Sequence, residues 1–247
     1  MQVLLIIINI CYLNYGDYML QKDYKKYLIK GIVVFLIFYF GAYLQYIPIK
    51  LFNLDTDNLS KSMRVILSSF SSICMLIIFI IIYHKDLKED FIKFKNNLLE
   101  NLDIGLKYWL YGLIVMIISN LILMFIFKSG GADNENIVQE MLKTLPWLMF
   151  INAGIIAPIN EEIVFRKTLK DVIADKWFLV CMSFLLFGGA HVIHTATTLI
   201  DYLYIIPYGA LGGAFALAYY KSDTIYTSIF MHMFHNLILA ILSIIVL

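Results

Sequence analysis

Long apolar stretches, separated by short polar segments, occupy most of the chain. A stretch of about 20 apolar residues crosses a bilayer as a helix, because each residue rises about 1.5 Å and a helix satisfies its own backbone polar groups. Eight stretches meet this criterion and predict an all-α, polytopic bundle of about eight transmembrane helices. The predicted spans are 3–20, 28–47, 63–83, 106–127, 144–166, 177–195, 199–220 and 224–247.

Three shorter patterns add detail. In segment 85–105, apolar residues recur every three or four positions with lysines between them, which is typical of an amphipathic helix on a membrane surface. Segment 129–136 is polar and rich in turn residues, so it predicts a loop. Gly209 and Gly213 form a G-x-x-x-G pattern that favours close helix packing. The predicted apolar face of the surface helix is Leu87, Phe91, Phe94, Leu98 and Leu102.

The first span has a competing interpretation as a secretory signal. Polar residues interrupt it, but the chain begins without a basic segment and no small-residue cleavage site follows. A membrane span is therefore the preferred interpretation, and whether it is retained stays open.

Composition supports the membrane assignment. Apolar residues make up 61% of the chain and charged residues 15%, and the mean hydropathy is +0.80. Soluble domains average about 45–50% apolar and about 25% charged residues, so water-soluble enzyme folds are excluded. A net charge of +1 provides no basic surface for nucleic acid. Cys11, Cys74 and Cys181 lie in apolar stretches and form neither a disulfide framework nor a metal-ligand spacing.

Basic residues are unevenly distributed between alternate loops. One set of loops holds 14 of the 19 lysines and arginines, and the other set holds 5. Because basic residues are retained preferentially in the cytoplasm, we expect the first set inside and both chain termini outside. This places Lys170 inside and Asn134 outside. The basic-rich segments are 22–30, 85–107, 166–176 and Lys221.

Ionisable side chains gather in three of the C-terminal spans. An ionisable group at mid-membrane costs about 2.5–3.5 kcal/mol, so such groups usually face a protein interior and indicate function. The residues concerned are Glu161, Glu162 and Arg166 in the fifth span, His191 and His194 in the sixth, and His232, His235 and Asn236 in the eighth.

Helix geometry suggests how these residues pair. Glu162 and Arg166 are four apart and form an ion pair on one face, whereas Glu161 is turned about 100° away. Glu161 and His191 are each 15 residues from Lys176 in the intervening turn, so both lie about 22 Å from it. We therefore expect the carboxylate, the imidazoles and the carboxamide to meet within the membrane.

Three short motifs combine these residues. Segment 157–166 (APINEEIVFR) contains E-E-x-x-x-R, segment 187–191 (FGGAH) contains F-x-x-x-H, and segment 232–236 (HMFHN) contains H-x-x-x-N. In order and spacing they resemble the signatures of the CPBP family (CAAX-protease and bacteriocin-processing, also called Abi) of intramembrane proteases. Lys167 departs from the family, in which many members have Gly after the Arg.

The resemblance covers about residues 144–245. It implies a CPBP-like protease core at 144–247, preceded by a region of N-terminal spans at 1–143. It also implies a multi-pass protein of the cell membrane whose active site is accessible from the cytoplasmic side.

The resemblance further implies an endopeptidase in which Glu161 activates water. Peptide hydrolysis needs a base within reach of water and donors aimed at the developing oxyanion. His191 is expected to share the water with Glu161, and His232 and Asn236 are expected to be oxyanion donors. For Glu162 and Arg166, the preferred interpretation is a structural ion pair rather than a chemical role. The candidate catalytic residues are Glu161, Glu162, Arg166, His191, His232 and Asn236.

A metal ion is the alternative source of this chemistry. The family is often labelled metalloprotease, and a zinc ion would be bound by His191, His232 and Glu161, as in His₂Glu hydrolases. Using Glu161 as a ligand would remove the best base, so a metal-free mechanism is favoured and zinc remains open. His194 and His235 extend the motifs to two H-x-x-H pairs, but packing or interfacial positions are preferred for both.

Three functions compete. The leading one is an intramembrane endopeptidase that cuts a membrane-associated peptide or leader. The others are a non-proteolytic bacteriocin-immunity or scaffold protein and a proton-coupled transporter, although no paired Pro/Gly-broken spans support the transporter. Abundant Ile, Lys, Asn and Tyr suggest a bacterium, so a pheromone precursor or a bacteriocin leader is the preferred substrate.

Overall fold

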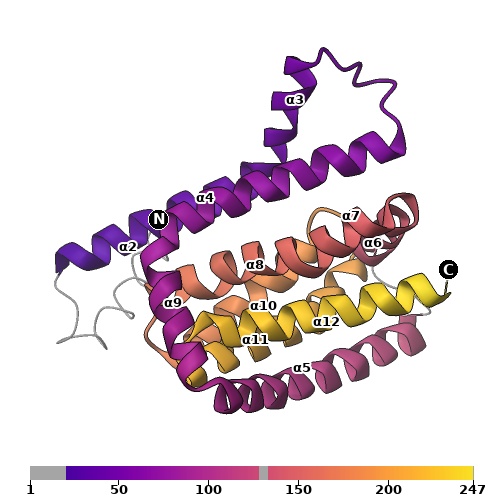
Figure 1. Ribbon diagram of the computed structural model, residues 1–247. Helices are drawn as coiled ribbons and strands as arrows, with labels where there is room; N and C mark the ends of the chain where they lie inside the picture. The colour runs from indigo at the N-terminus through magenta and orange to yellow at the C-terminus, as the bar shows by residue number, and fades with distance from the viewer. Residues whose placement is uncertain (1–20, 128–132, 247) are drawn as a thin grey trace.

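The computed structural model describes residues 21–127 and 133–246, and the regular elements in these ranges are all helical. The long helices run back and forth between two ends of one bundle (Figure 1). The helices are α2 (Gln21–Phe40), the 3₁₀-helix η1 (Gly41–Gln45), α3 (Tyr46–Leu51), α4 (Lys61–Asn96), α5 (Leu98–Phe127), α6 (Asp133–Thr144), α7 (Pro146–Ile151), the π-helix η2 (Asn152–Ile156), α8 (Ala157–Glu162), the π-helix η3 (Ile163–Lys167), α9 (Thr168–Lys170), α10 (Lys176–Val192), the 3₁₀-helix η4 (Asp201–Tyr204), α11 (Ile205–Ser222) and α12 (Ile225–Val246).

Six helical stretches of the described chain are long and apolar enough to cross a membrane. They confirm a multi-pass helical membrane protein but not the predicted count of eight spans. The span expected at 177–195 is the shorter α10, whose 17 residues measure about 26 Å. The span expected at 3–20 lies outside the described residues. The six stretches are Tyr24–Leu51, Lys61–Asn96, Leu98–Phe127, Pro146–Lys170, Asp201–Ser222 and Ile225–Ile245.

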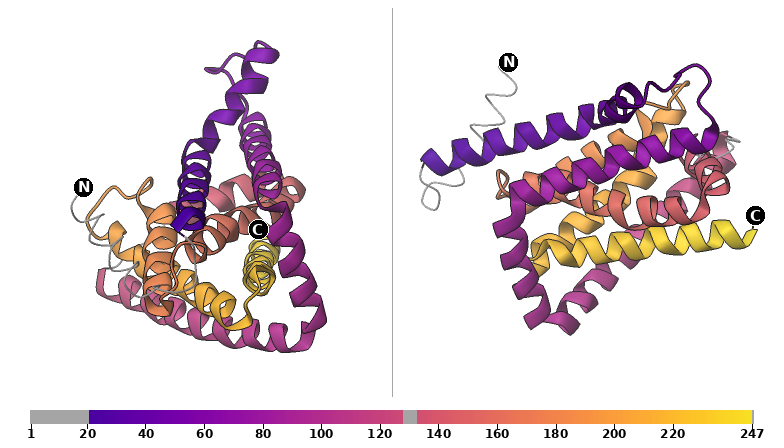
Figure 2. Two further views of the ribbon diagram at one scale, coloured as in Figure 1. Left: turned by 90° about the vertical axis from the view of Figure 1, so that its left-hand side faces the viewer. Right: turned by 45° about the horizontal axis from the view of Figure 1, so that its top comes forward.

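The surface helix expected at 85–105 is not a separate element. α4 and α5 divide this segment between them, with one residue between the two helices. The last part of α4 nevertheless bends and crosses the end of the bundle (Figure 2). Leu87 and Phe94 are buried there as predicted, whereas Phe91 and Leu98 are 48% and 44% exposed. The buried face is therefore turned relative to the predicted apolar face.

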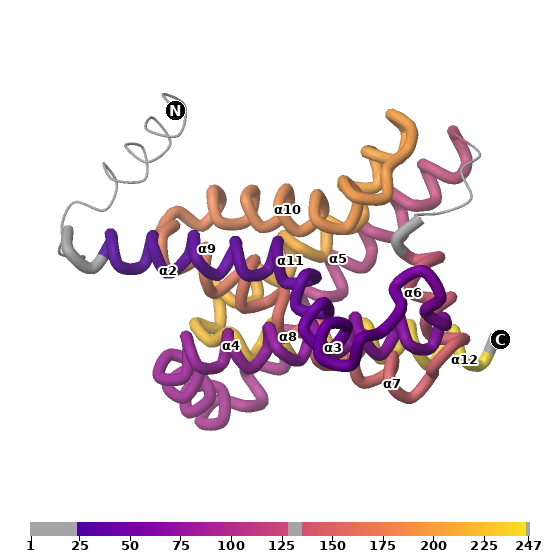
Figure 3. Tube along the Cα trace, turned by 90° about the horizontal axis from the view of Figure 1, so that it is seen from above, coloured from indigo at the N-terminus to yellow at the C-terminus, as the bar shows by residue number. Residues whose placement is uncertain are grey.

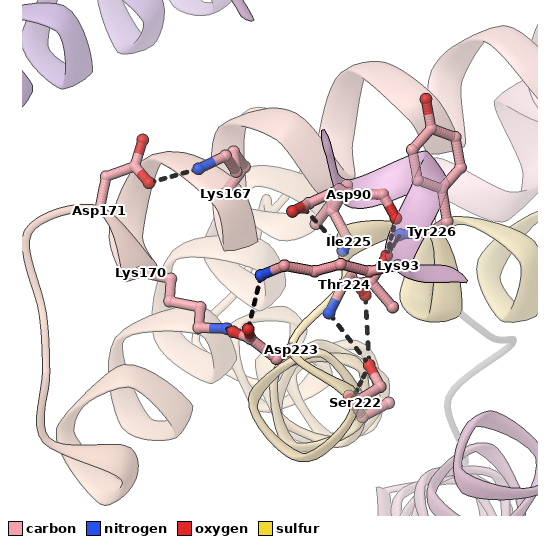
Figure 4. A network of polar contacts seen from close by, with 11 residues as sticks. Asp90, Lys93, Lys167, Lys170, Asp171, Ser222, Asp223, Thr224, Ile225 and Tyr226 are labelled. Carbon is pink, nitrogen blue, oxygen red and sulfur yellow. Dashed lines mark hydrogen bonds and ion pairs between the residues drawn. The ribbon is translucent and has the colours of Figure 1, made fainter. Parts of the chain in front are cut away.

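Asp90 explains this turn, because it points inward to meet the start of α12 (Figure 4). The hydroxyl of Thr224 donates to the carbonyl oxygen of Asp90 over 2.8 Å, and the backbone N–H of Ile225 donates to Asp90 Oδ2 over 3.1 Å. The first N–H groups of a helix have no partner within the helix, and a carboxylate satisfies them favourably. The α4 carboxylate thus caps α12.

One core joins the two regions on either side of the predicted division at 143/144. Val34 of α2 and Phe79 of α4 belong to the same cluster of buried side chains as Val164 of η3 and Ile225 of α12. Seen from above, α2 and α4 lie over the Pro146–Lys170 stretch (Figure 3). The division itself stays a prediction.

Asp223 connects three elements at the end of the bundle where α4, α9 and the α11–α12 turn meet (Figure 4). Its carboxylate accepts hydrogen bonds from Lys93 Nζ and Lys170 Nζ, each over 2.7 Å. Its φ of 52° lies in the left-handed region, which Asp and Asn tolerate better than most residues. Burial alone would raise the pKa of the Asp223 carboxyl, but the two lysine hydrogen bonds outweigh it and leave the pKa below its ordinary value.

We expect Asp223→Ala to lower the thermal unfolding midpoint more than Asp223→Asn. Both changes remove the lysine pairs, which contribute about 0.2–1 kcal/mol each at exposed sites. Alanine additionally carries the left-handed backbone penalty of about 1–2 kcal/mol, which asparagine largely avoids. Thermal unfolding in detergent measures the difference, and equal midpoints for the two variants would contradict the backbone argument.

The same residue predicts a pH dependence. Because the pKa of Asp223 is lowered in the folded protein, its stabilising contribution is present above the ordinary carboxyl value of 3.8 and disappears as the pH falls below it. The stability difference between the wild type and Asp223→Asn should therefore be constant near neutral pH and vanish only in strong acid.

Candidate functional site

The first motif lies in a continuous helical stretch that contains two π-helical turns. η2 precedes α8 and η3 follows it, so Glu161 and Glu162 end a short α-helical segment between two wider turns. Side chains hydrogen-bond to a carbonyl in each turn. Asn236 Nδ2 donates to the Ala153 oxygen over 2.9 Å, and Thr168 Oγ1 donates to a carbonyl of η3 over the same distance. Such turns are uncommon and often occur at functional sites.

Glu162 is fully buried and has two charged or polar partners. Its Oε1 lies 3.1 Å from Arg166 Nη1, and His232 Nδ1 donates to the same oxygen over 2.8 Å. The predicted ion pair is therefore present, and an imidazole joins it. Because an unpaired buried charge is costly, these contacts are what allow both charged groups to lie inside the bundle.

Arg166 is also fully buried, and aromatic rings surround it. Its guanidinium carbon lies 4.3 Å from the centre of the Phe187 ring and 5.5 Å from that of Phe215. Its Nη2 donates to the Gly212 carbonyl oxygen over 3.3 Å. The cation is thus held by a carboxylate, a backbone carbonyl and two ring faces, a combination of ion-pair and cation–π contacts.

Glu161 is directed away from the ion pair, as helix geometry predicted. Its Oε2 lies 3.6 Å from His232 Nε2 and 3.9 Å from His191 Nε2. These distances exceed those of direct hydrogen bonds, and Oε2 has no hydrogen-bond partner in the described part of the chain. They suit polar groups that share one water molecule. His232 therefore lies between the two glutamates, with Nδ1 on Glu162 and Nε2 facing Glu161.

His191 has a defined tautomer. Its Nδ1 lies 2.9 Å from the carbonyl oxygen of Phe187, one turn earlier in α10. A carbonyl only accepts, so Nδ1 carries the proton, and Nε2 of the neutral ring is an acceptor that faces Glu161. The predicted meeting of Glu161 and His191 is therefore present in the structure.

Asn236 makes a contact that the sequence does not predict. One of its two amide N–H groups is used by the Ala153 carbonyl in η2, because Asn236 lies one turn beyond His232 and reaches the π-helical turn. Only its second N–H and its side-chain oxygen remain for a role beside Glu161. Asn236 therefore helps to hold η2 against α12.

His194 and His235, the other two histidines of the C-terminal spans, lie outside the Glu161 cluster. His194 is exposed, with its ring 5.8 Å from that of Tyr39, and His235 Nδ1 accepts a 3.3 Å hydrogen bond from Trp109 Nε1. Both contacts agree with packing positions. Within residues 21–127 and 133–246, no three His, Cys, Asp or Glu side chains are arranged to hold a metal ion.

α11 contributes to the site in a way that its sequence does not reveal. Gly212 supplies the carbonyl for Arg166, and a Cβ there would lie 2.9 Å from the Ser183 carbonyl oxygen. Of the two glycines in the predicted G-x-x-x-G pattern, Gly209 is packed as closely against α10, whereas a Cβ at Gly213 would make only ordinary van der Waals contacts. The only available signal was a helix with many small residues, which indicates close packing but no chemistry.

Comparisons with known proteins agree with the motifs. A family model described as type II CAAX prenyl endopeptidase Rce1-like matches residues 143–238, which contain all three motifs. The chain is 28% identical over 123 residues to YdiL of Bacillus subtilis (strain 168), a protein named provisionally as a membrane peptidase. This match covers 48% of the chain and 47% of YdiL, so the chain spans about half the length of that relative.

Two relatives from Lactococcus lactis subsp. lactis (strain IL1403) match over more of their length. UPF0177 protein YbdI is 28% identical over 183 residues, which are 70% of this chain and 93% of YbdI. UPF0177 protein YxdF is 26% identical over 148 residues, which are 57% of this chain and 79% of YxdF. No solved structure matches. The family match over the three motifs, together with the weaker match to a named membrane peptidase, supports a protein of the CPBP family.

Proposed function

We propose that this protein is an intramembrane endopeptidase that hydrolyses a peptide bond in a membrane-associated peptide or leader. One observation carries the proposal: a carboxylate oxygen of Glu161 without a hydrogen-bond partner faces the Nε2 atoms of two imidazoles. A carboxylate base that faces two nitrogen atoms is an arrangement that peptide hydrolysis can use, because the base must lie within reach of the attacking water.

Glu161 and His191 activate the water. One water proton is directed to Glu161 Oε2 and the other to the unprotonated Nε2 of His191, which leaves the oxygen lone pair free to attack the peptide carbonyl carbon. Glu161 takes the first proton as the C–O bond forms. It then gives the proton to the leaving nitrogen as the C–N bond breaks, and the products are a carboxylic acid and an amine.

His232 stabilises the oxyanion. In its doubly protonated form it donates Nδ1–H to Glu162 and presents Nε2–H to the reacting centre. Arg166 balances the charge of Glu162, so the imidazolium and the two carboxylates are not left with an excess of negative charge. The second N–H of Asn236 completes the pair of donors.

The substrate site opens towards the cytoplasm. The loops rich in lysine and arginine meet at the end of the bundle where Asp223 binds its lysines, and basic residues are retained on the cytoplasmic side. The residue usage supports a bacterial source, in which a pheromone precursor or a bacteriocin leader is the preferred substrate.

Substitution by glutamine is expected to have different effects on cleavage and on protein abundance at the two adjacent glutamates. Glu161→Gln should lower cleavage by about 10²–10⁴-fold at normal protein abundance, because only the base is lost. Glu162→Gln should also lower abundance, because removing one member of a buried ion pair costs about 3–5 kcal/mol. Quantitative immunoblots of membranes and a cleavage assay compare the two variants. Equal abundance with equal loss of cleavage would assign chemistry to Glu162 as well.

A comparison of membrane peptides tests proteolysis directly. Strains with the wild-type gene, a deletion or Glu161→Ala are compared by mass spectrometry of their membrane fractions. The deletion and Glu161→Ala strains should lack the same cleavage products. A Glu161→Ala strain that matches the wild type would favour the immunity or scaffold function instead.

Removal of metal separates the two mechanisms. Purified protein treated with a strong chelator should retain its cleavage activity, because Glu161 acts as a base rather than as a ligand. Loss of activity that is restored by equimolar Zn²⁺, with one bound metal per chain, would overturn this mechanism.

Cysteine labelling tests the orientation. In a background without native cysteines, Lys88→Cys at the basic-rich end should react with a membrane-impermeant maleimide only after cells are opened. Asp57→Cys in the opposite loop should react in intact cells, and both side chains are exposed. The reverse pattern would contradict cytoplasmic access.

A further inference from the structure

Two rings of α11 stack on the two imidazoles that face Glu161. The ring of Tyr208 lies 4.8 Å from that of His191 with an interplanar angle of 24°. The ring of Phe215 lies 5.0 Å from that of His232 at 27°. α11 carries none of the three motifs, yet it contacts the histidine of two of them.

The same face of α11 reaches the third motif. Gly212 lies between Tyr208 and Phe215, and its carbonyl oxygen accepts the hydrogen bond from Arg166. These three residues are spaced by four and three positions, so they lie along one face of the helix. One face of α11 therefore contacts all three motifs.

Hydrogen bonds alone leave each imidazole with rotational freedom. His191 is bound through Nδ1 to the Phe187 carbonyl, and His232 through Nδ1 to Glu162. A single bond at Nδ1 fixes one atom, and the second side-chain torsion of histidine has a broad distribution. A ring face at close distance limits the tilt of the imidazole plane, and so fixes where Nε2 points.

Close packing of α10 on α11 makes this contact possible. A Cβ at Gly209 would lie 2.8 Å from the Phe184 carbonyl oxygen, and one at Gly212 would lie 2.9 Å from that of Ser183. Real Cβ atoms do not approach a backbone carbonyl so closely, so side chains at these positions would separate the helices. Phe215 is fully buried in the resulting space.

We propose that Tyr208 and Phe215 are positioning residues, which hold His191 and His232 with both Nε2 atoms directed at Glu161. At position 208 the proposal rests on the ring, which is stacked on His191. The consequence for cleavage rests on the proposed function, whereas the orientation of the imidazoles does not.

The orientation is measured by NMR of the full chain in lipid nanodiscs, with histidine rings labelled. His191→Gln and His232→Gln assign the two ring signals by their loss. In the wild type, the stacked ring of Tyr208 should shift the His191 ring protons upfield. Tyr208→Phe should retain this shift, and Tyr208→Leu should reduce it to the part contributed by the Phe187 ring, which lies 4.4 Å from that of His191. Phe215→Leu gives the same test at His232, and an unchanged His235 signal, beside Trp109, shows that each variant is folded.

Cleavage provides the second measurement, with a peptide that spans the cleavage site identified by the membrane-peptide comparison. Tyr208→Leu should lower kcat about tenfold or more with KM within twofold of the wild type, because misplaced groups slow the reacting step rather than binding. Tyr208→Phe should cleave at the wild-type rate.

Several outcomes would overturn the proposal. These are an unshifted His191 signal in the wild type, wild-type cleavage by a folded Tyr208→Leu variant, or equal losses in Tyr208→Phe and Tyr208→Leu. If the wild type itself cleaves nothing, the proposed function fails, and the NMR shifts still decide whether the rings position the histidines.

Discussion

The charge of Arg166, buried completely among apolar helices, constrains the rest of this structure. A cation in that position must be compensated, and the compensating groups come from separate elements: Glu162 from its own helical stretch and the Gly212 carbonyl from α11. The Phe187 ring of α10 covers the guanidinium. Three helices are thereby fixed to one point, and His232 of α12 is added through Glu162. The need to compensate the buried charge of Arg166 therefore determines how these helices are arranged around the site.

Adjacent carboxylates consequently differ in what they can do. Glu162 is inaccessible and its Oε1 contacts a guanidinium and an imidazole, whereas the side chain of Glu161, the preceding residue, is 16% exposed and its Oε2 faces two imidazoles at 3.6 and 3.9 Å. The difference arises from their direction on the helix, because both are the same residue type at nearly the same depth. His232 faces both and lies between the ion-paired carboxylate of Glu162 and that of Glu161.

Sequence patterns predicted the helical class, most of the span positions and the meeting of Glu161 with His191, because charge within apolar stretches is conspicuous. They failed where a contact depends on a distant element. Asp90 faces inward only because α12 begins beside it, and Asn236 turns to a carbonyl that only a π-helical turn presents. Tyr208 and Phe215 are ordinary apolar positions in sequence, and their role depends on how closely α10 approaches α11. Periodicity has no information on these tertiary contacts.

The number of residues in the two π-helical turns around α8 affects which contacts the site can make. Each turn closes its hydrogen bonds over five residues instead of four, so it holds a residue that a regular helix would not accommodate in the same rise. Loss of a single residue from η2 would leave every motif intact and let the turn close as a regular α-helix, in which the Ala153 carbonyl would bond within the helix instead of accepting from Asn236. A one-residue gap within 152–156 in an alignment of relatives would therefore mark the loss of this contact between η2 and α12.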